Sequence, residues 1–218
     1  MQMSTFGPLI PAAIAFLSSL TIYLRRDRET YLRFFPLFLL IVCTQEAISG
    51  YRQSIHILNN LFYYNPYTIL VCCFYFLTVY WIIRSKKVKR IILVILFLYP
   101  LIAAINILFL QKADSFHSIT YSLGGLIIVA LCVYYFFELF QAPANASLLR
   151  QPSFWICSGL LFYYSCSFPL YGFNNLLASA SLTVIKNLIF VFQILDVLLY
   201  LSFTIAFLCR LRVRKSTS

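Results

Sequence analysis

Two carboxylic acids lie inside long apolar runs of the sequence, and they are the strongest candidates for chemistry. Glu46 follows the apolar residues 37–43, and Asp196 lies near the middle of the run 185–209. A carboxylate at the centre of a membrane-spanning helix costs about 2.5–3.5 kcal/mol on insertion scales, so such groups usually face protein or water rather than lipid. We therefore predict that both acids point into the interior of a helical bundle.

Polar side chains accompany each acid at helical spacing. Gln193, Asp196 and Tyr200 stand at positions i, i+3 and i+7, which share one face of a helix. With the polar neighbours of Glu46 and one asparagine of the next apolar run, they form a candidate ligand or proton site: Glu46, Asp196, Gln45, Gln193, Ser49, Tyr200 and Asn65. Such stripes predict a polar pocket or ion path. The structural alternative is that the acids join helices through hydrogen bonds.

More asparagines and tyrosines collect towards one end of the apolar runs, the predicted outer half. They are Asn60, Asn65, Tyr67, Asn106, Tyr121, Tyr171, Asn174 and Asn175. Each one alone is typical of the belt of side chains at a membrane surface. Together they favour a small-molecule pocket that opens to the outside.

The composition indicates an integral membrane protein. The chain has 218 residues, of which 62% are hydrophobic and 11% charged, whereas soluble domains carry about 25% charged residues. The net charge of +11 does not indicate nucleic-acid binding, because the basic residues form short clusters between apolar runs. In that position we expect them to contact anionic lipids of the bilayer.

Seven apolar runs approach the length of about 20 residues that crosses a bilayer. They are residues 8–24, 34–51, 64–83, 91–110, 119–140, 153–173 and 185–209. The predicted fold is all-α, a bundle of seven transmembrane helices. We expect residues 1–218 to form this single domain, with no extramembrane domain.

The positions of lysine and arginine predict the orientation of the bundle, because these residues favour cytoplasmic loops. Fourteen of the 17 fall on one side of the predicted topology: Arg25, Arg26, Arg28, Arg33, Arg84, Lys86, Lys87, Lys89, Arg90, Arg150, Arg210, Arg212, Arg214 and Lys215. This assigns the N-terminus to the outside and the C-terminus to the cytoplasm, in the inner membrane of a cell.

The sequence lacks the residues that several kinds of cofactor and metal site need. Retinal needs a lysine in mid-span, and Lys186 lies at an outer end. His56 and His117 fall in predicted outer loops, where we expect them to be solvated, and they form no metal-binding spacing. The seven cysteines lie in or beside apolar runs and form no CxxC pair, which is typical of small apolar helix residues. We expect no catalytic residue, metal or cofactor, and hence no enzyme.

Three segments of the sequence are similar to segments of a known protein family. They are TQEAISGY at 44–51, NNLFYYNPYTIL at 59–70 and QPSFWICSGLLFYYS at 151–165. They resemble the seven-helix membrane regions that bacteria carry either alone or ahead of a histidine kinase or another output domain. The matching positions are Glu46, Asn65, Trp155 and Gly159. The resemblance implies membrane sensing or signalling. Because the sequence ends nine residues after Cys209, signalling would need a cytoplasmic or membrane protein partner.

These observations favour a sensor of a small ligand or of the membrane state. A small secondary transporter, with a proton or substrate site at the two acids, remains an alternative. A structural subunit of a membrane complex is the third possibility.

Overall fold

The computed structural model describes residues 7–23, 29–55, 61–110, 116–141, 148–172 and 182–209. Every regular element in these ranges is a helix, which confirms the predicted all-α class. The longer helices are α1 (Leu9–Ser19), α3 (Phe35–Ser54), α4 (Leu61–Ile82), α5 (Lys86–Ile105), α6 (Ser118–Gln141), α7 (Pro152–Gly172) and α9 (Leu182–Leu208). The short ones are η1 (Leu20–Ile22), α2 (Thr30–Arg33), η2 (Asn106–Leu110) and η3 (Leu148–Arg150).

Five helical segments are long and apolar enough to cross a bilayer, and they mark the chain as a membrane protein. They are Thr30–Ser54, Tyr63–Ile82, Lys86–Leu110, Ser118–Gln141 and Asn187–Leu208. The two remaining predicted spans correspond to α1, which with η1 covers only Leu9–Ile22, and to α7. Helix α7 has 21 residues, but it contains several serines and tyrosines and is therefore less apolar.

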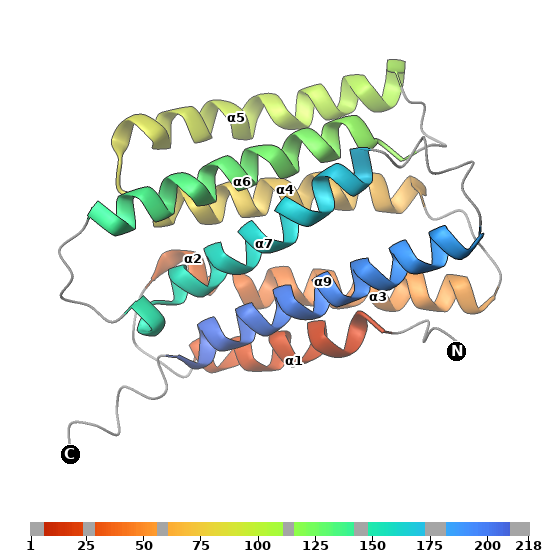
Figure 1. The fold of residues 1–218 in the computed structure, drawn as a ribbon, viewed down its shortest axis with the longest axis horizontal. Helices are drawn as coiled ribbons and strands as arrows, with labels where there is room; N and C mark the ends of the chain where they lie inside the picture. The colour runs from red at the N-terminus through yellow and green to blue at the C-terminus, as the bar shows by residue number, and fades with distance from the viewer. Residues whose placement is uncertain are drawn as a thin grey trace.

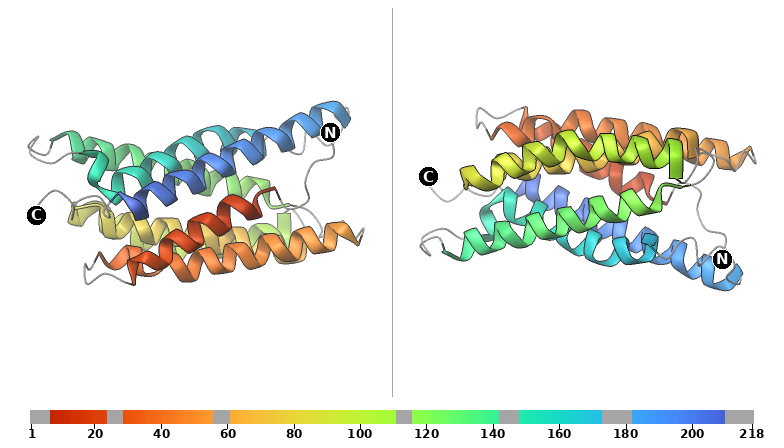
Figure 2. Two further views of the ribbon diagram at one scale, coloured as in Figure 1. Left: turned by 90° about the horizontal axis from the view of Figure 1, so that it is seen from below. Right: turned by 90° about the horizontal axis from the view of Figure 1, so that it is seen from above.

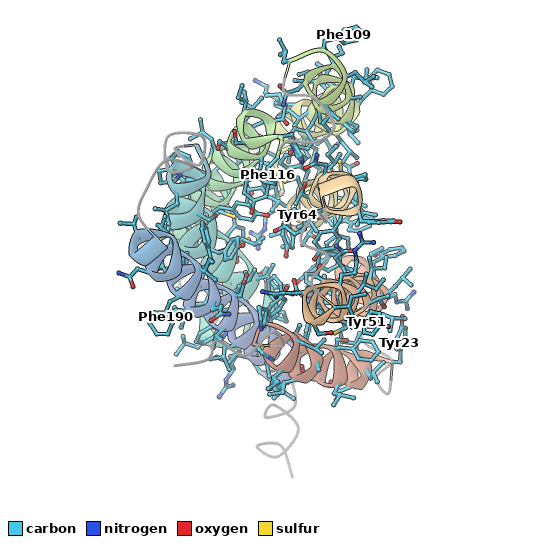
Figure 3. The ribbon with its side chains drawn as sticks, turned by 90° about the vertical axis from the view of Figure 1, so that its right-hand side faces the viewer. Tyr23, Tyr51, Tyr64, Phe109, Phe116 and Phe190 are labelled. Atoms are coloured by element: carbon cyan, nitrogen blue, oxygen red, sulfur yellow. The ribbon has the colours of Figure 1, made fainter. Side chains whose placement is uncertain are left out.

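The long helices run side by side along one axis, with the start of α1 and the end of α9 at opposite ends (Figures 1 and 2). Seen end-on, they surround a central region (Figure 3). Helix α1 packs against α3 and α9, and α7 packs between α6 and α9. Helix α4 contacts α5 and α6. Side chains of α3, α4, α6, α7 and α9 can therefore point towards one central space.

Helix α5 lies at the edge of the bundle (Figure 1), and many of its apolar side chains are exposed. Phe97 is 72% exposed, and Phe109 in the following η2 segment is 78% exposed. Phe109 points away from the bundle (Figure 3). A continuous apolar surface of this kind is what a lipid-facing helix requires.

A cluster of five phenylalanines joins α3, α4 and α9. Its members are Phe35, Phe38, Phe74, Phe203 and Phe207, referred to below as the phenylalanine cluster. Phe38 stacks on Phe74 with ring centroids 3.9 Å apart. Phe35 meets Phe74, Phe203 and Phe207 edge-on at 5.1, 5.4 and 5.5 Å, a favourable geometry for aromatic pairs. The cluster fills the bundle beneath the central space, at the end where α3 begins and α9 ends.

Helices α7 and α9 approach closely at a glycine. A Cβ atom added at Gly159 would lie 2.7 Å from the Cβ of Ser202, which is shorter than a van der Waals contact. The absence of a side chain at Gly159 thus allows the close approach of the helix that carries Asp196 and the helix that carries Tyr163.

Glu138, near the end of α6, caps the turn between α4 and α5. Its carboxylate accepts hydrogen bonds from the backbone N–H groups of Arg84 and Ser85, both at 2.9 Å. These N–H groups lie at the start of α5, where no helical carbonyl is available to them. One side chain therefore holds together elements more than 50 residues apart in sequence.

We expect Glu138→Ala to lower the free energy of unfolding by about 1 kcal/mol, because two N–H groups lose a charged acceptor but remain accessible to water. Thermal unfolding of the purified protein in detergent measures this loss. Phe137→Leu, on the exposed face of the same helix, is the control and should have little effect. An equal loss in both variants would contradict the capping role.

Candidate functional site

A cavity lies in the centre of the bundle, and side chains from five helices surround it. Its volume is about 70 Å³, and part of it is continuous with the outside. Its lining residues are Glu46 (α3), Tyr64, Tyr67, Thr68, Val71 and Tyr75 (α4), Tyr121 (α6), Tyr163 and Tyr164 (α7), and Asp196, Leu199 and Tyr200 (α9). Tyr64 points inward, whereas Tyr51 and Phe190 point away from the bundle (Figure 3).

Both intramembrane acids line this cavity. Glu46 reaches it from α3 and Asp196 from α9, so their inward placement agrees with the cost of exposing a carboxylate to lipid. Tyr163 of α7 lines the same cavity as Asp196 of α9. None of the twelve lining residues is a lysine, arginine or histidine. Among the described residues, the cavity wall therefore holds two acids and no basic side chain.

Tyrosines form most of the remaining wall. Seven of the twelve lining residues are tyrosines, at positions 64, 67, 75, 121, 163, 164 and 200. Of these tyrosines, the sequence names only Tyr200 as a candidate site residue. Tyr67 and Tyr121 belong to the outer-half group, in which each residue alone is typical of a surface belt and all together favour a pocket. The sequence pattern that indicates these tyrosines is the spacing of Tyr64, Tyr67, Val71 and Tyr75 at i, i+3, i+7 and i+11. This spacing places the four residues on one side of α4, the side that faces the cavity.

Four predicted site residues do not line the cavity. Gln45 instead donates to the Ser49 hydroxyl at 3.5 Å along α3. Gln193, about one turn before Asp196, is half-buried outside the cavity wall. Asn65 is buried between α4 and the start of α6, where its backbone carbonyl accepts from Thr68 at 2.8 Å. The polar stripes predicted from spacing are thus wider than the surface that faces the cavity.

His117 is buried, and the prediction that it is solvated in a loop is wrong. Its Nδ1 lies 2.7 Å from the Thr120 hydroxyl, and its Nε2 lies 2.6 Å from the Thr68 hydroxyl. Nε2 is also 3.2 Å from the Asn65 carbonyl oxygen. Since a carbonyl can only accept, Nε2 carries the proton and Nδ1 accepts from Thr120. Because Thr68 lines the cavity, His117 supports the wall from behind.

Burial lowers the pKa of His117, which lies just before α6, while the hydrogen bond to the Asn65 carbonyl opposes this shift. With the pKa lowered, the unfolded chain binds more protons than the folded protein below the ordinary value near 6.5. Stability should therefore fall as the pH drops below about 6.5. Unfolding temperatures measured between pH 7.5 and 5 should show this fall, and His117→Gln should reduce its slope. An unchanged slope in the variant would contradict this role.

The structure also corrects the assignment of Asn106 to the surface belt. Asn106 is buried and donates to the Thr120 hydroxyl at 3.2 Å, so it joins the hydrogen-bonded group around His117. His56, Asn60, Asn174 and Asn175 lie outside the described residues, as does the side chain of Tyr171.

No metal centre is present in the part of the chain that the structure describes, where no three His, Cys, Asp or Glu side chains gather. The seven cysteines are all free, and Cys72, Cys132 and Cys157 are fully buried. The chemistry available at the cavity is thus that of two carboxyl groups, seven phenol groups and one threonine hydroxyl.

No protein-family model, curated protein or solved structure matches this chain. The resemblance to bacterial seven-helix sensor regions therefore remains a hypothesis. Of its four matching positions, Glu46 lines the cavity, and Asn65 and Gly159 lie at helix–helix contacts. Trp155 donates from Nε1 to the Leu149 carbonyl at 2.9 Å, in the turn before α7.

Proposed function

We propose that this protein is a membrane sensor that binds a small ligand in the central cavity and signals through a protein partner. The observation that carries the proposal is that both intramembrane acids, from helices far apart in sequence, line the same cavity. If the acids only joined helices through hydrogen bonds, each acid would need no more than one partner on a neighbouring helix. That role does not require space between the acids and seven aromatic rings.

The phenylalanine cluster favours a sensor over a transporter. Phe35 and Phe203 are fully buried, and Phe38 is 2% exposed, so the rings pack tightly beneath the cavity. A transporter would have to open this packing in every cycle. Tyr75 both lines the cavity and contacts Phe38 and Phe203, with ring centroids at 5.4 and 6.2 Å. A ligand that displaces Tyr75 would therefore shift the packing of α3 against α9.

The proposal includes seven spans, with α1 and α7 completing the bundle, and an outer N-terminus. Its support is the distribution of basic residues over the described helices. One end of the bundle holds Arg33, Arg84, Lys86, Lys87, Lys89, Arg90 and Arg150, whereas Arg52 and Lys186 lie towards the other. The basic end would face the cytoplasm, where it can contact anionic lipids and the signalling partner. In bacteria this assigns the protein to the inner membrane.

Ligand binding and flux are to be measured on the same purified protein. A panel of small cations, anions, zwitterions and neutral compounds is tested for a rise in unfolding temperature, followed by a thiol-reactive dye that reports exposure of Cys72, Cys132 and Cys157. The active compounds are then tested for flux in proteoliposomes. A sensor should show stabilisation that is lost in Asp196→Asn, without flux of the compound or of protons.

Two outcomes would contradict the sensor. Flux of an active compound, with proton coupling lost in Glu46→Gln, would make the protein a transporter. If no class of compound stabilises the wild-type protein, the cavity does not bind a ligand, and the result favours a structural subunit.

A further inference from the structure

We propose that the ligand of the central cavity is a small organic cation, either an amine or a quaternary ammonium compound. This inference rests on the proposed function, since it assumes that the cavity binds a ligand, and it names the chemical class of that ligand.

The charge of the cavity wall is the first argument. Glu46 and Asp196 face the same space, and no basic side chain is among the twelve lining residues. Carboxylates removed from bulk water need an opposite charge nearby, because their desolvation is costly when they are unpaired. An anionic ligand would add repulsion, and a neutral ligand would leave the two acids unbalanced. A cation supplies the charge that none of these twelve lining residues provides.

The aromatic wall is the second argument. Seven tyrosines from α4, α6, α7 and α9 surround the acids. The face of an aromatic ring is negative and attracts cations, and groups of such rings are a known means of binding quaternary ammonium compounds. Tyr64 points into the bundle beside Phe116, with ring centroids 5.9 Å apart (Figure 3). Rings thus continue around the end of the bundle where α4 begins.

The size and chemistry of the cavity favour an organic ion over a bare metal ion. The cavity volume of about 70 Å³, part of it open to the outside, is several times the roughly 10–15 Å³ that a single water molecule needs. Calcium takes six to eight oxygen ligands, whereas this wall offers two carboxyl groups, and its other side-chain oxygens are the hydroxyl groups of seven tyrosines and one threonine. Asp196 and Tyr163 line the cavity together, so a carboxyl group and a phenol group can both contact an ammonium group there.

The experiment compares three probes of similar shape and different charge on the full chain in detergent, at constant ionic strength. They are choline, the neutral 3,3-dimethylbutan-1-ol and the anionic 3,3-dimethylbutanoate. Choline should raise the unfolding temperature in a saturable manner, and the neutral and anionic probes should bind at least about tenfold more weakly, which is 1.4 kcal/mol. Sodium and potassium ions alone should not reproduce the effect of choline.

Variants identify the groups that bind choline. Asp196→Asn and Glu46→Gln should each weaken choline binding by about tenfold or more. Tyr67→Phe keeps the ring and should retain binding, whereas Tyr67→Leu removes the ring and should weaken it. Ser49→Ala, a polar neighbour of Glu46 outside the cavity wall, is the matched control and should bind choline as the wild-type protein does.

The two proposals fail in different ways. If a neutral or anionic compound stabilises the protein in an Asp196-dependent manner and choline does not, the cation inference is wrong and the sensor remains. If sodium or potassium reproduces the effect of choline, the ligand is an inorganic ion. If no compound of any charge stabilises the wild-type protein, both proposals are wrong.

Discussion

Phe35→Ala is expected to lower the free energy of unfolding by about 3–5 kcal/mol, the usual range for removing a fully buried phenylalanine. Phe35 has no exposed surface and touches Phe38, Phe74, Phe203 and Phe207. Its loss would leave a hole where α3, α4 and α9 meet, because the four remaining rings cannot close around it. Thermal and denaturant unfolding in detergent measure the effect.

Two further variants test whether the loss comes from packing in the phenylalanine cluster. Phe35→Leu keeps much of the side-chain volume and should cost clearly less than Phe35→Ala. Phe97→Ala, on the exposed face of α5 where the residue is 72% exposed, should change stability little. If Phe35→Ala costs no more than Phe97→Ala, the cluster does not stabilise the end of the bundle where α3 begins and α9 ends.

Neutralising both acids, in the double variant Glu46→Gln/Asp196→Asn, is expected to stabilise the protein when no ligand is added. Desolvating one carboxylate costs several kcal/mol, and the described residues of the cavity wall offer the two acids no basic partner. Because the cavity is partly open, water already relieves some of this cost, and we expect a gain of about 2 kcal/mol. For a chain of this size that corresponds to a rise of roughly 4–8 °C in unfolding temperature.

This prediction distinguishes two roles of the acids, namely binding a ligand and joining helices through hydrogen bonds. If the acids hold helices together, the double variant should be less stable or fail to assemble. If they serve a ligand, it should be more stable and unresponsive to that ligand, a common relation between stability and function. Ser49→Ala, outside the cavity wall, is the control and should leave the unfolding temperature unchanged.

The sequence by itself determined the helical elements and the two acids. A run of about 20 apolar residues is a local property, and it specifies a helix in a membrane whatever the rest of the chain does. Helices α3, α4, α5, α6 and α9 could therefore be predicted, as could the inward placement of Glu46 and Asp196, since exposing either to lipid is costly. Helix α7 is less apolar and α1 is short. That these two helices also cross the membrane is therefore part of the proposed function.

Only the tertiary structure decided what surrounds these acids. Tyrosine occurs both at membrane surfaces and in buried walls. The sequence therefore favoured a pocket for the group that contains Tyr67 and Tyr121, but it could not decide for either residue alone between the surface belt and the cavity, which both of them line. The burial of His117 depends on Thr68 and Asn65 of α4, about 50 residues earlier in the chain. Spacing within one helix defines which residues share a face, whereas the packing of α3, α4, α6, α7 and α9 around one space decides which faces meet.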